Sequence, residues 1–257
     1  LHYWITRTAK AHLTYSSLCN NVAFGGIGFG ACPKGGGKPI SPRIMRWAAA
    51  KSGPGAAVSQ EGNVAFIDPS AVKTVAILGM GSVGSGWAAL LLARGIRVQA
   101  FDPGADAAAT AQQLIAGAWP SLIELGLTAR AEPPDRKIQF FGTADRALDG
   151  ADAVFENVPE KLELKHSVLA QADAVTSADV PILSSAGGIS PTEMQAACAH
   201  PERLLVVHPF NPSHLIPLVE IVPGEATSEA AVAWAMAFSR SLGKKPITLS
   251  REMPGHK

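Results

Sequence analysis

A histidine and a glutamate in the last quarter of the chain have the context of a general base and its partner. His208 lies in the apolar run Arg203–Pro212 (RLLVVHPFNP), and Glu220 follows 12 residues later in a second apolar run, Leu218–Pro223. A neutral imidazole can accept a hydroxyl proton near pH 7, and a carboxylate on its other nitrogen would orient it. A histidine at a strand end can equally be structural, and the spacing alone leaves both interpretations open.

A glycine-rich turn between two other apolar runs could bind the phosphates of a dinucleotide. Residues 73–102 read KTVAILGMGSVGSGWAALLLARGIRVQAFD, in which Gly79, Gly81 and Gly84 form the pattern G-x-G-x-x-G. Gly79 permits a tight turn, Gly81 lets the backbone approach a pyrophosphate, and Gly84 lets a helix pack close to the strand. The pattern is stronger than a lone glycine motif because strand, helix and strand patterns surround it.

The same stretch contains an acid that would select the cofactor. The helix begins near Ser82 and Val83, where free backbone N–H groups would face the pyrophosphate. Asp102 lies 18 residues past Gly84, where the second strand should end and accept a hydrogen bond from the adenosine ribose 2′-OH. A carboxylate there would repel a 2′-phosphate. The stretch therefore predicts NAD as cofactor, and not NADP.

The alternative for this stretch is a membrane span. Thr74–Ala93 carries no charge and is long enough to cross a bilayer, and Gly81, Ser85 and Ala89 would form a small-residue packing face. Glycines interrupt its first half, however, and a strand that ends on an acid follows directly. The pattern favours nucleotide binding.

Composition indicates a soluble globular protein. The chain has 257 residues, of which 47% are hydrophobic and 17% charged, and the net charge of +1 does not suggest a nucleic-acid or membrane partner. Cys19, Cys32 and Cys198 form neither a disulfide framework nor a metal-ligand spacing. We therefore expect a reducing compartment, a cytoplasmic location, no metal and a small-molecule substrate.

Residues 1–72 differ in charge from the rest of the chain. They carry seven Lys/Arg and two Asp/Glu, whereas residues 73–257 carry 15 and 19. No apolar periodicity persists there, so we expect an irregular extension, and the segment GGIGFG lacks the flanking strands of a second nucleotide loop. An acid-poor, basic N-terminus could also be a transit segment, and the location would then be the mitochondrial matrix.

From Lys73 onward, strand and helix patterns alternate as in a Rossmann-type α/β domain with a doubly wound, mostly parallel sheet. After residues 73–102 we expect a helical region at 105–126 interrupted at Pro120, strands at 140–141 and 153–158, a helix at 162–174, a strand at 181–188, a helix opened by Pro191, strands at 203–212 and 218–223, a helix at 228–242 closed by Gly243, and a strand at 246–249. We place the NAD-binding domain at 73–250, after the extension 1–72.

Several blocks of this sequence resemble the 3-hydroxyacyl-CoA dehydrogenase superfamily. They are GMGSVGSGWA at 79–88, NVPEKLELK at 157–165, HPFNP at 208–212 and PLVEIV at 217–222. They occur in the family's order. That family oxidises L-3-hydroxy groups to 3-ketones with NAD. The resemblance implies that His208 is the catalytic base, that Glu220 orients it and that Asn211 is the asparagine that follows the base.

The resemblance also assigns residues to the cofactor and substrate. Glu160 and Lys165 match residues on the cofactor's ribose side; without the resemblance they would be a solvated helix start and a surface cation. Gly187 stands where the family commonly has a serine that contacts the substrate hydroxyl, and Ser184 or Ser185 could replace that donor.

The family continues into an all-helical domain that completes the substrate site and forms a dimer. We expect residues 251–257 to be the start of a linker to that domain, which this chain lacks. Full-length relatives should therefore be homodimers. This chain should be a monomer that binds NAD but turns over poorly.

Two segments point to one branch of the superfamily. HPFNPSHLIPLVEIVP and AWPSLIELGL resemble carnitine dehydrogenase and lambda-crystallin, which is a gulonate dehydrogenase. No Lys or Arg lies between Arg97 and Arg130 to bind the phosphates of CoA. We therefore expect a short L-3-hydroxy acid such as carnitine as substrate. The alternatives are an L-3-hydroxyacyl-CoA, as in fatty acid metabolism, and a non-catalytic NAD-binding or crystallin-like protein.

Overall fold

The computed structural model describes residues 65–249 and 252. The strands within this part are β1 Thr74–Leu78, β2 Arg97–Phe101, β3 Ile138–Phe140, β4 Ala153–Glu156, β5 Ile182–Ser184, β6 Leu204–Pro209, β7 Leu218–Pro223 and β8 Lys245–Thr248. The α-helices are α1 Ser82–Ala93, α2 Ala107–Glu124, α3 Ala144–Leu148, α4 Leu162–Val175, α5 Pro191–Gln195 and α6 Glu229–Ser241. Short 3-10 turns lie at Pro69–Ala71, Asp135–Lys137 and Pro201–Arg203.

The strands form one sheet in the order β3-β2-β1-β4-β5-β6-β7-β8. Pairing is parallel from β3 to β6, antiparallel between β6 and β7, and parallel between β7 and β8. The chain reverses its winding direction after β3, where it returns to the other side of β1. The expected doubly wound, mostly parallel sheet is confirmed, and its reversal point lies beside the glycine-rich turn.

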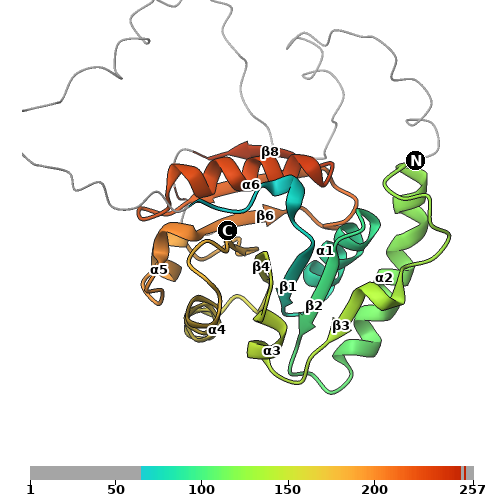
Figure 1. Cartoon of the computed structure of the whole chain (residues 1–257), viewed down its shortest axis with the longest axis horizontal. Coiled ribbons are helices and arrows are strands. Elements are labelled where there is room, and N and C mark those ends of the chain that lie inside the picture. The colour runs from blue at the N-terminus through green and yellow to red at the C-terminus, as the bar shows by residue number, and fades with distance from the viewer. Residues whose placement is uncertain (1–64, 250–251, 253–257) are drawn as a thin grey trace, which may run out of the picture. The chain divides into compact units, whose positions relative to one another are not determined.

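Helices cover both faces of the sheet, as Figure 1 shows. One apolar core joins the sheet to α1, α2 and α6, and the other joins it to α3, α4 and α5. In the first core, Trp87 from α1 and Phe238 from α6 both contact the ring of Phe155 on β4, at centroid distances of 4.9 and 6.4 Å. The first core therefore links the helix after the glycine turn to the last helix of the domain.

The uncharged run at the start of the domain is a buried helix and strand. It divides into β1 and α1, and α1 is buried from Gly84 to Leu92 because it lies between the sheet and α2. In the part of the chain that the structure describes, no helix is long and apolar enough to cross a membrane.

The helix α2 differs from the expected interrupted helix. It runs without a break through Pro120, so the predicted interruption is wrong. A proline removes one backbone hydrogen bond, and here burial of the neighbouring Trp119 and Leu122 holds the helix together. The indole N–H of Trp119 also donates to the carbonyl of Arg130 at 3.0 Å, which ties α2 to the loop that follows it.

The remaining predicted helices and strands lie where expected, but β4, β5 and β6 end earlier than expected, at Glu156, Ser184 and Pro209. Ser190 caps α5 with a full capping box and Pro191 is its first residue, as the sequence indicates. Gly243 follows α6 with φ of 89°. The short helix α3 was missed because its five residues are too few to show a period.

The described part of the N-terminal extension begins at residue 65. Phe66 and Ile67 pack against the core, and the indole N–H of Trp234 on α6 donates to the Ile67 carbonyl at 2.6 Å. The predictions for residues 1–64, including the GGIGFG segment and the transit-segment alternative, lie outside the described residues.

The antiparallel step between β6 and β7 follows from the length of their connection. A parallel connection needs a crossover of roughly a dozen residues or more, and the loop 210–217 is shorter than that. The reversal pairs His208 directly with Glu220 across the two strands. The loop length in the sequence therefore implied the antiparallel direction of β7, though not the register that pairs these two residues.

Candidate active site and cofactor crevice

The glycine-rich turn has the geometry that a dinucleotide loop requires. Gly79 has φ of +90°, and a Cβ there would lie 2.6 Å from the Asn157 carbonyl oxygen. A Cβ on Gly84 would overlap the Gly79 carbonyl oxygen, so the helix can approach the strand only with glycine at that position. A Cβ on Gly81 would meet no atom within 4 Å, so Gly81 faces open space where α1 begins.

The acid at the end of β2 reaches the glycine turn. Asp102 Oδ2 accepts the backbone N–H of Met80 at 2.8 Å, and Oδ1 accepts the N–H of Gly104 at 2.9 Å. A carboxylate has about four lone-pair positions, so these bonds leave capacity for a ribose hydroxyl. Asp102 therefore lies beside the open end of α1, where Ser82 and Val83 form the first turn.

An unsatisfied acceptor also lies beside the turn. Within the described residues, Asn157 Oδ1 is buried and has no hydrogen-bond partner, and Asn157 follows β4 next to Gly79. Buried polar atoms in folded proteins almost always have a partner. The open space at Gly81 and this unpaired oxygen both fit a bound polar molecule in the crevice, as NAD would be.

Glu160 lies just before α4 and is partly exposed, whereas Lys165 lies inside the protein. Lys165 is fully buried, and its Nζ lies 2.8 and 2.9 Å from the two carboxylate oxygens of the equally buried Glu156. It also lies 3.7 Å from Glu160, whose side chain is 43% exposed. Reading Lys165 as a surface cation is thus wrong, because Glu156 compensates the charge inside the protein.

Glu160 holds the loop after β5. Its Oε1 accepts the backbone N–H groups of Gly188 and Ile189 at 2.7 and 3.1 Å. Ser184 at the end of β5 is fully buried and donates to Glu156 Oε2 at 2.5 Å, so its hydroxyl is committed to the interior. Of the two serines considered as substrate donors, Ser185 is the one that is only partly buried.

His208 and Glu220 form a pair at the carboxyl end of β6. His208 Nδ1 lies 3.3 Å from Glu220 Oε2, and the two side chains are 24% and 15% exposed. This distance is at the long end for a hydrogen bond, as is common in catalytic pairs without substrate. Because Nδ1 faces Glu220, Nε2 is the ring nitrogen left for a substrate, and Phe210 packs edge-on against the ring at 5.6 Å between centroids.

Gly187 lies against the reactive side of that ring. A Cβ on Gly187 would come 2.8 Å from His208 Nε2, closer than real Cβ contacts. Glycine at this position therefore lets the imidazole occupy its present place. Asn211, the third residue assigned to catalysis, is exposed at the start of the loop 210–217.

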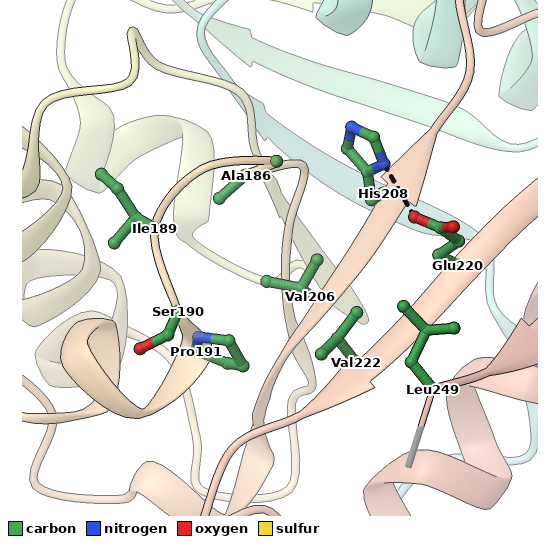
Figure 2. Close-up of a pocket in the computed structure, with 10 residues that line it drawn as sticks. Ala186, Ile189, Ser190, Pro191, Val206, His208, Glu220, Val222 and Leu249 are labelled. Atoms are coloured by element: carbon green, nitrogen blue, oxygen red, sulfur yellow. Dashed lines mark hydrogen bonds and ion pairs between the residues drawn. The ribbon is translucent and has the colours of Figure 1, made fainter. Parts of the chain in front are cut away.

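A small pocket extends from the pair towards the end of the described chain. Figure 2 shows His208 and Glu220 at one end and the apolar side chains of Val206, Val222 and Leu249 beside them. Its volume is about 30 Å³, which is room for little more than one small group. In residues 65–249 and 252, no group of three His, Cys, Asp or Glu side chains could hold a metal ion.

Residues 74–253 match the family model "3-hydroxyacyl-CoA dehydrogenase, NAD binding domain". The chain belongs to this family. The match begins at β1 and covers every strand and α-helix described above, including the glycine turn and the His208–Glu220 pair. NAD is therefore the cofactor of this domain, as the carboxylate at the end of β2 indicates.

Curated relatives within the 3-hydroxyacyl-CoA dehydrogenase family include L-carnitine dehydrogenases. The enzyme from Streptomyces griseus is 48% identical over 199 residues, which are 77% of this chain and 59% of the relative. The enzyme from Pseudomonas aeruginosa is 43% identical over 184 residues, 72% of this chain and 57% of the relative. The chain thus spans less than two thirds of the length of these relatives.

Solved structures of the family share the fold. The (S)-3-hydroxybutyryl-CoA dehydrogenase from Ralstonia eutropha matches with a TM-score of 0.66 and 30% identity, over 72% of this chain and 65% of that one. An NAD+-dependent dismutase, 5-formyl-3-hydroxy-2-methylpyridine-4-carboxylic acid 5-dehydrogenase, matches with a TM-score of 0.67 and 33% identity, over 72% and 59%.

Sequence reasoning missed two polar residues of the site. Glu156 ends the apolar run AVFE, and Asn157 follows it. An acid inside a buried strand with a lysine nine residues later was the available signal for the buried pair.

Proposed function

We propose that the protein oxidises the 3-hydroxyl of a short L-3-hydroxy acid, such as L-carnitine, to the 3-keto acid with NAD. The observation that carries this proposal is the His208–Glu220 pair at the carboxyl end of β6, on the sheet whose glycine turn opens the cofactor crevice. Ligands of such sheets bind outside the carboxyl ends of the strands. The similarity to L-carnitine dehydrogenases supports the choice of substrate.

His208 acts as the general base in this proposal. Glu220 accepts a hydrogen bond from Nδ1–H. The proton therefore stays on Nδ1, and Nε2 remains unprotonated and turned to the substrate. Nε2 takes the proton of the 3-hydroxyl while the hydrogen on C3 leaves with its two electrons and the carbon–oxygen double bond forms. Bound NAD supplies the acceptor for that hydride. The Glu220 carboxylate then stabilises the imidazolium until it loses its proton to water.

The cofactor residues have separable roles. The backbone at Gly79, Gly81 and Gly84 and the first turn of α1 bind the pyrophosphate. Asp102 accepts a hydrogen bond from the ribose 2′-OH and repels a 2′-phosphate by its charge.

Glu160 and Lys165 form the next part of the crevice. Glu160 is partly exposed, so it can reach the ribose side of the cofactor while it fixes the loop after β5. Lys165 lies 3.7 Å from Glu160 and is itself held in place by its ion pair with the buried Glu156.

One feature favours the short hydroxy acid over an acyl-CoA. The segment from β2 to the end of α2 has no Lys or Arg after Arg97, so it offers no cation to a CoA phosphate. The acyl-CoA alternative is supported by the likeness to the (S)-3-hydroxybutyryl-CoA dehydrogenase. A non-catalytic NAD-binding protein is the other alternative, and it would show no turnover of any substrate.

We place the protein in the cytoplasm because of its composition and because Cys198 is a free thiol.

A substrate panel tests the proposal directly. The 257-residue chain is incubated with NAD and L-carnitine, D-carnitine, L-3-hydroxybutyrate or L-3-hydroxybutyryl-CoA, and NADH absorbance is followed. We expect NADH from L-carnitine and none from its enantiomer. A preference for the CoA ester would favour the acyl-CoA alternative. NAD binding without turnover of any substrate, in this chain and also in a version extended by a helical domain, would favour the non-catalytic alternative.

A further inference from the structure

A buried lysine lies close to the active site and has no place in the mechanism above. Lys244, between α6 and β8, is 5% exposed. Its Nζ donates to the backbone carbonyls of Ser213 and Ile216, the second at 2.8 Å, and lies 5.3 Å from the ring centroid of Trp87. Burial lowers the pKa of Lys244 from 10.5 to about 8, which shows that the site disfavours the charge.

Both carbonyls belong to the loop that follows the catalytic strand. Residues 210–217 connect β6 to β7, begin two residues after His208 and contain Asn211. Within the loop, the N–H groups of Leu215 and Ile216 both donate to the Pro212 carbonyl, at 2.9 and 3.0 Å. Lys244 therefore contacts the loop from the turn between α6 and β8, about 30 residues later in the chain, and it bonds to backbone atoms that any loop sequence would provide.

A second contact fastens the same loop to the cofactor helix. Ser213 is 1% exposed, and its Oγ donates to the Val83 carbonyl in the first turn of α1 at 3.0 Å. A Cβ on Gly86 would overlap this Oγ. Glycine is unfavourable inside a helix, and the close approach of the loop explains why this helix has one there.

We propose that Lys244 is a positioning residue for the dehydrogenase reaction. It holds the loop 210–217 against α1, so that His208 and Asn211 keep a fixed position relative to the helix that binds the cofactor phosphates. Two backbone carbonyls and a tryptophan face compensate the buried charge of Lys244. The reaction part of this inference rests on the proposed function, whereas the loop part does not.

Other charged groups around Lys244 do not replace it. The ring of His214 lies in the same loop, and its pKa is lowered by burial and by the charge of Lys244. Arg94 at the end of α1 donates from Nε to the Leu242 carbonyl at 3.2 Å, so it fastens the end of α6 and not the loop. Lys245, the next residue, is exposed and serves as a matched control.

The first experiment measures the loop without using activity. Hydrogen exchange is followed by mass spectrometry in the 257-residue chain and in its Lys244→Met, Ser213→Ala and Lys245→Met variants. We expect exchange at Leu215 and Ile216 to rise roughly ten-fold or more in Lys244→Met and Ser213→Ala, with β1 and β4 unchanged. Lys245→Met should match the wild type.

The second experiment measures the consequence for catalysis. In Lys244→Met we expect kcat/KM for L-carnitine to fall roughly 10- to 100-fold, because a shift of about 1 Å in a catalytic group can cost on the order of 10²-fold. NAD affinity should stay within about two-fold, since α1 and its glycine turn do not depend on the loop. The double variant Lys244→Met/Ser213→Ala should lose less than the product of the two single losses, because both contacts hold one loop.

The outcomes separate this inference from the proposed function. Unchanged exchange at Leu215 and Ile216 in Lys244→Met, or exchange raised equally throughout the domain, would overturn the positioning role. So would an unchanged kcat/KM in a chain that does turn over L-carnitine. If the wild type turns over no substrate, the proposed function fails, and the exchange data alone decide whether Lys244 holds the loop.

Discussion

The two ends of the active crevice are built in different ways. At the cofactor end, around β1, α1 and β2, the backbone forms the site, and glycines allow it to turn and to approach other atoms. At the substrate end, around β6 and β7, side chains form the site, and they depend on partners across the sheet and in buried positions. The cofactor end is thus a local feature of about thirty residues, whereas the substrate end exists only in the folded domain.

The largest expected effect comes from removing the base at the substrate end. His208→Ala should lower kcat on the order of 10²- to 10⁴-fold, because general-base catalysis contributes about that much. NAD affinity should stay nearly intact, since His208 acts on the proton of the substrate. Glu220→Gln should cost less, because the base remains and loses only its orientation and charge stabilisation. Steady-state kinetics and NAD titration check this, and wild-type rates in the His208 variant would exclude it as the base.

An ion pair at the amino end of β6, away from His208, should make the domain sensitive to acid. Burial alone would raise the pKa of Asp173 on α4, but hydrogen bonds from Arg203 and from the backbone N–H groups of His200 and Ala199 outweigh it and hold that pKa below its usual 3.8. The Arg203 guanidinium, just before β6, is fully buried and lies 2.7 Å from this carboxylate. The ionised pair stabilises the fold above about pH 4, and this contribution is lost as the pH falls through the lowered pKa.

Asp173→Asn should therefore destabilise the domain by about 3–5 kcal/mol at neutral pH, because it leaves the Arg203 charge buried without its partner. Thermal unfolding between pH 7 and pH 3 measures both effects, and the exposed Asp179→Asn serves as the control. Equal stability of the two variants at neutral pH would contradict the prediction.

A side chain at Gly187 should disturb the base without affecting the cofactor. Gly187→Ser would restore the serine that the family commonly has, but its Cβ would fall 2.8 Å from His208 Nε2. We expect the ring to move and kcat/KM to fall roughly ten-fold, since catalytic groups must keep their geometry closely. Higher activity in Gly187→Ser would show instead that a serine hydroxyl at this position can bind the substrate without displacing His208.

The smallest expected effect is at the cofactor end, where replacing Asp102 should weaken the preference for NAD over NADP. Asp102→Ala removes the carboxylate that accepts the Met80 and Gly104 N–H groups. The ratio of NAD to NADP affinity should fall about ten-fold, in line with the loss of one hydrogen bond to a charged group. Isothermal titration with both cofactors measures the ratio. Equal affinities in the unmodified chain would contradict the role of Asp102.

The sequence predicted the glycine turn, the helix start and the acid at the cofactor end, because these are neighbours in the chain. It placed His208 and Glu220 on successive strands from two apolar runs, and the resemblance paired them. It could not predict that Lys165, Arg203 and Lys244 are buried, since a charged residue usually indicates a surface position. Their partners, Glu156, Asp173 and the loop carbonyls, come from other elements.

The transfer of hydrogen from C3 to the cofactor tests the central claim most directly. L-carnitine carrying deuterium at C3 is incubated with NAD and the 257-residue chain, and the reduced cofactor and the keto acid are quantified by mass spectrometry. The proposed mechanism predicts one deuterium in the reduced cofactor for each keto acid formed, and no product with His208→Ala beyond a small residual. Keto acid formed without label in the cofactor, or label transfer at the wild-type level in His208→Ala, would contradict it.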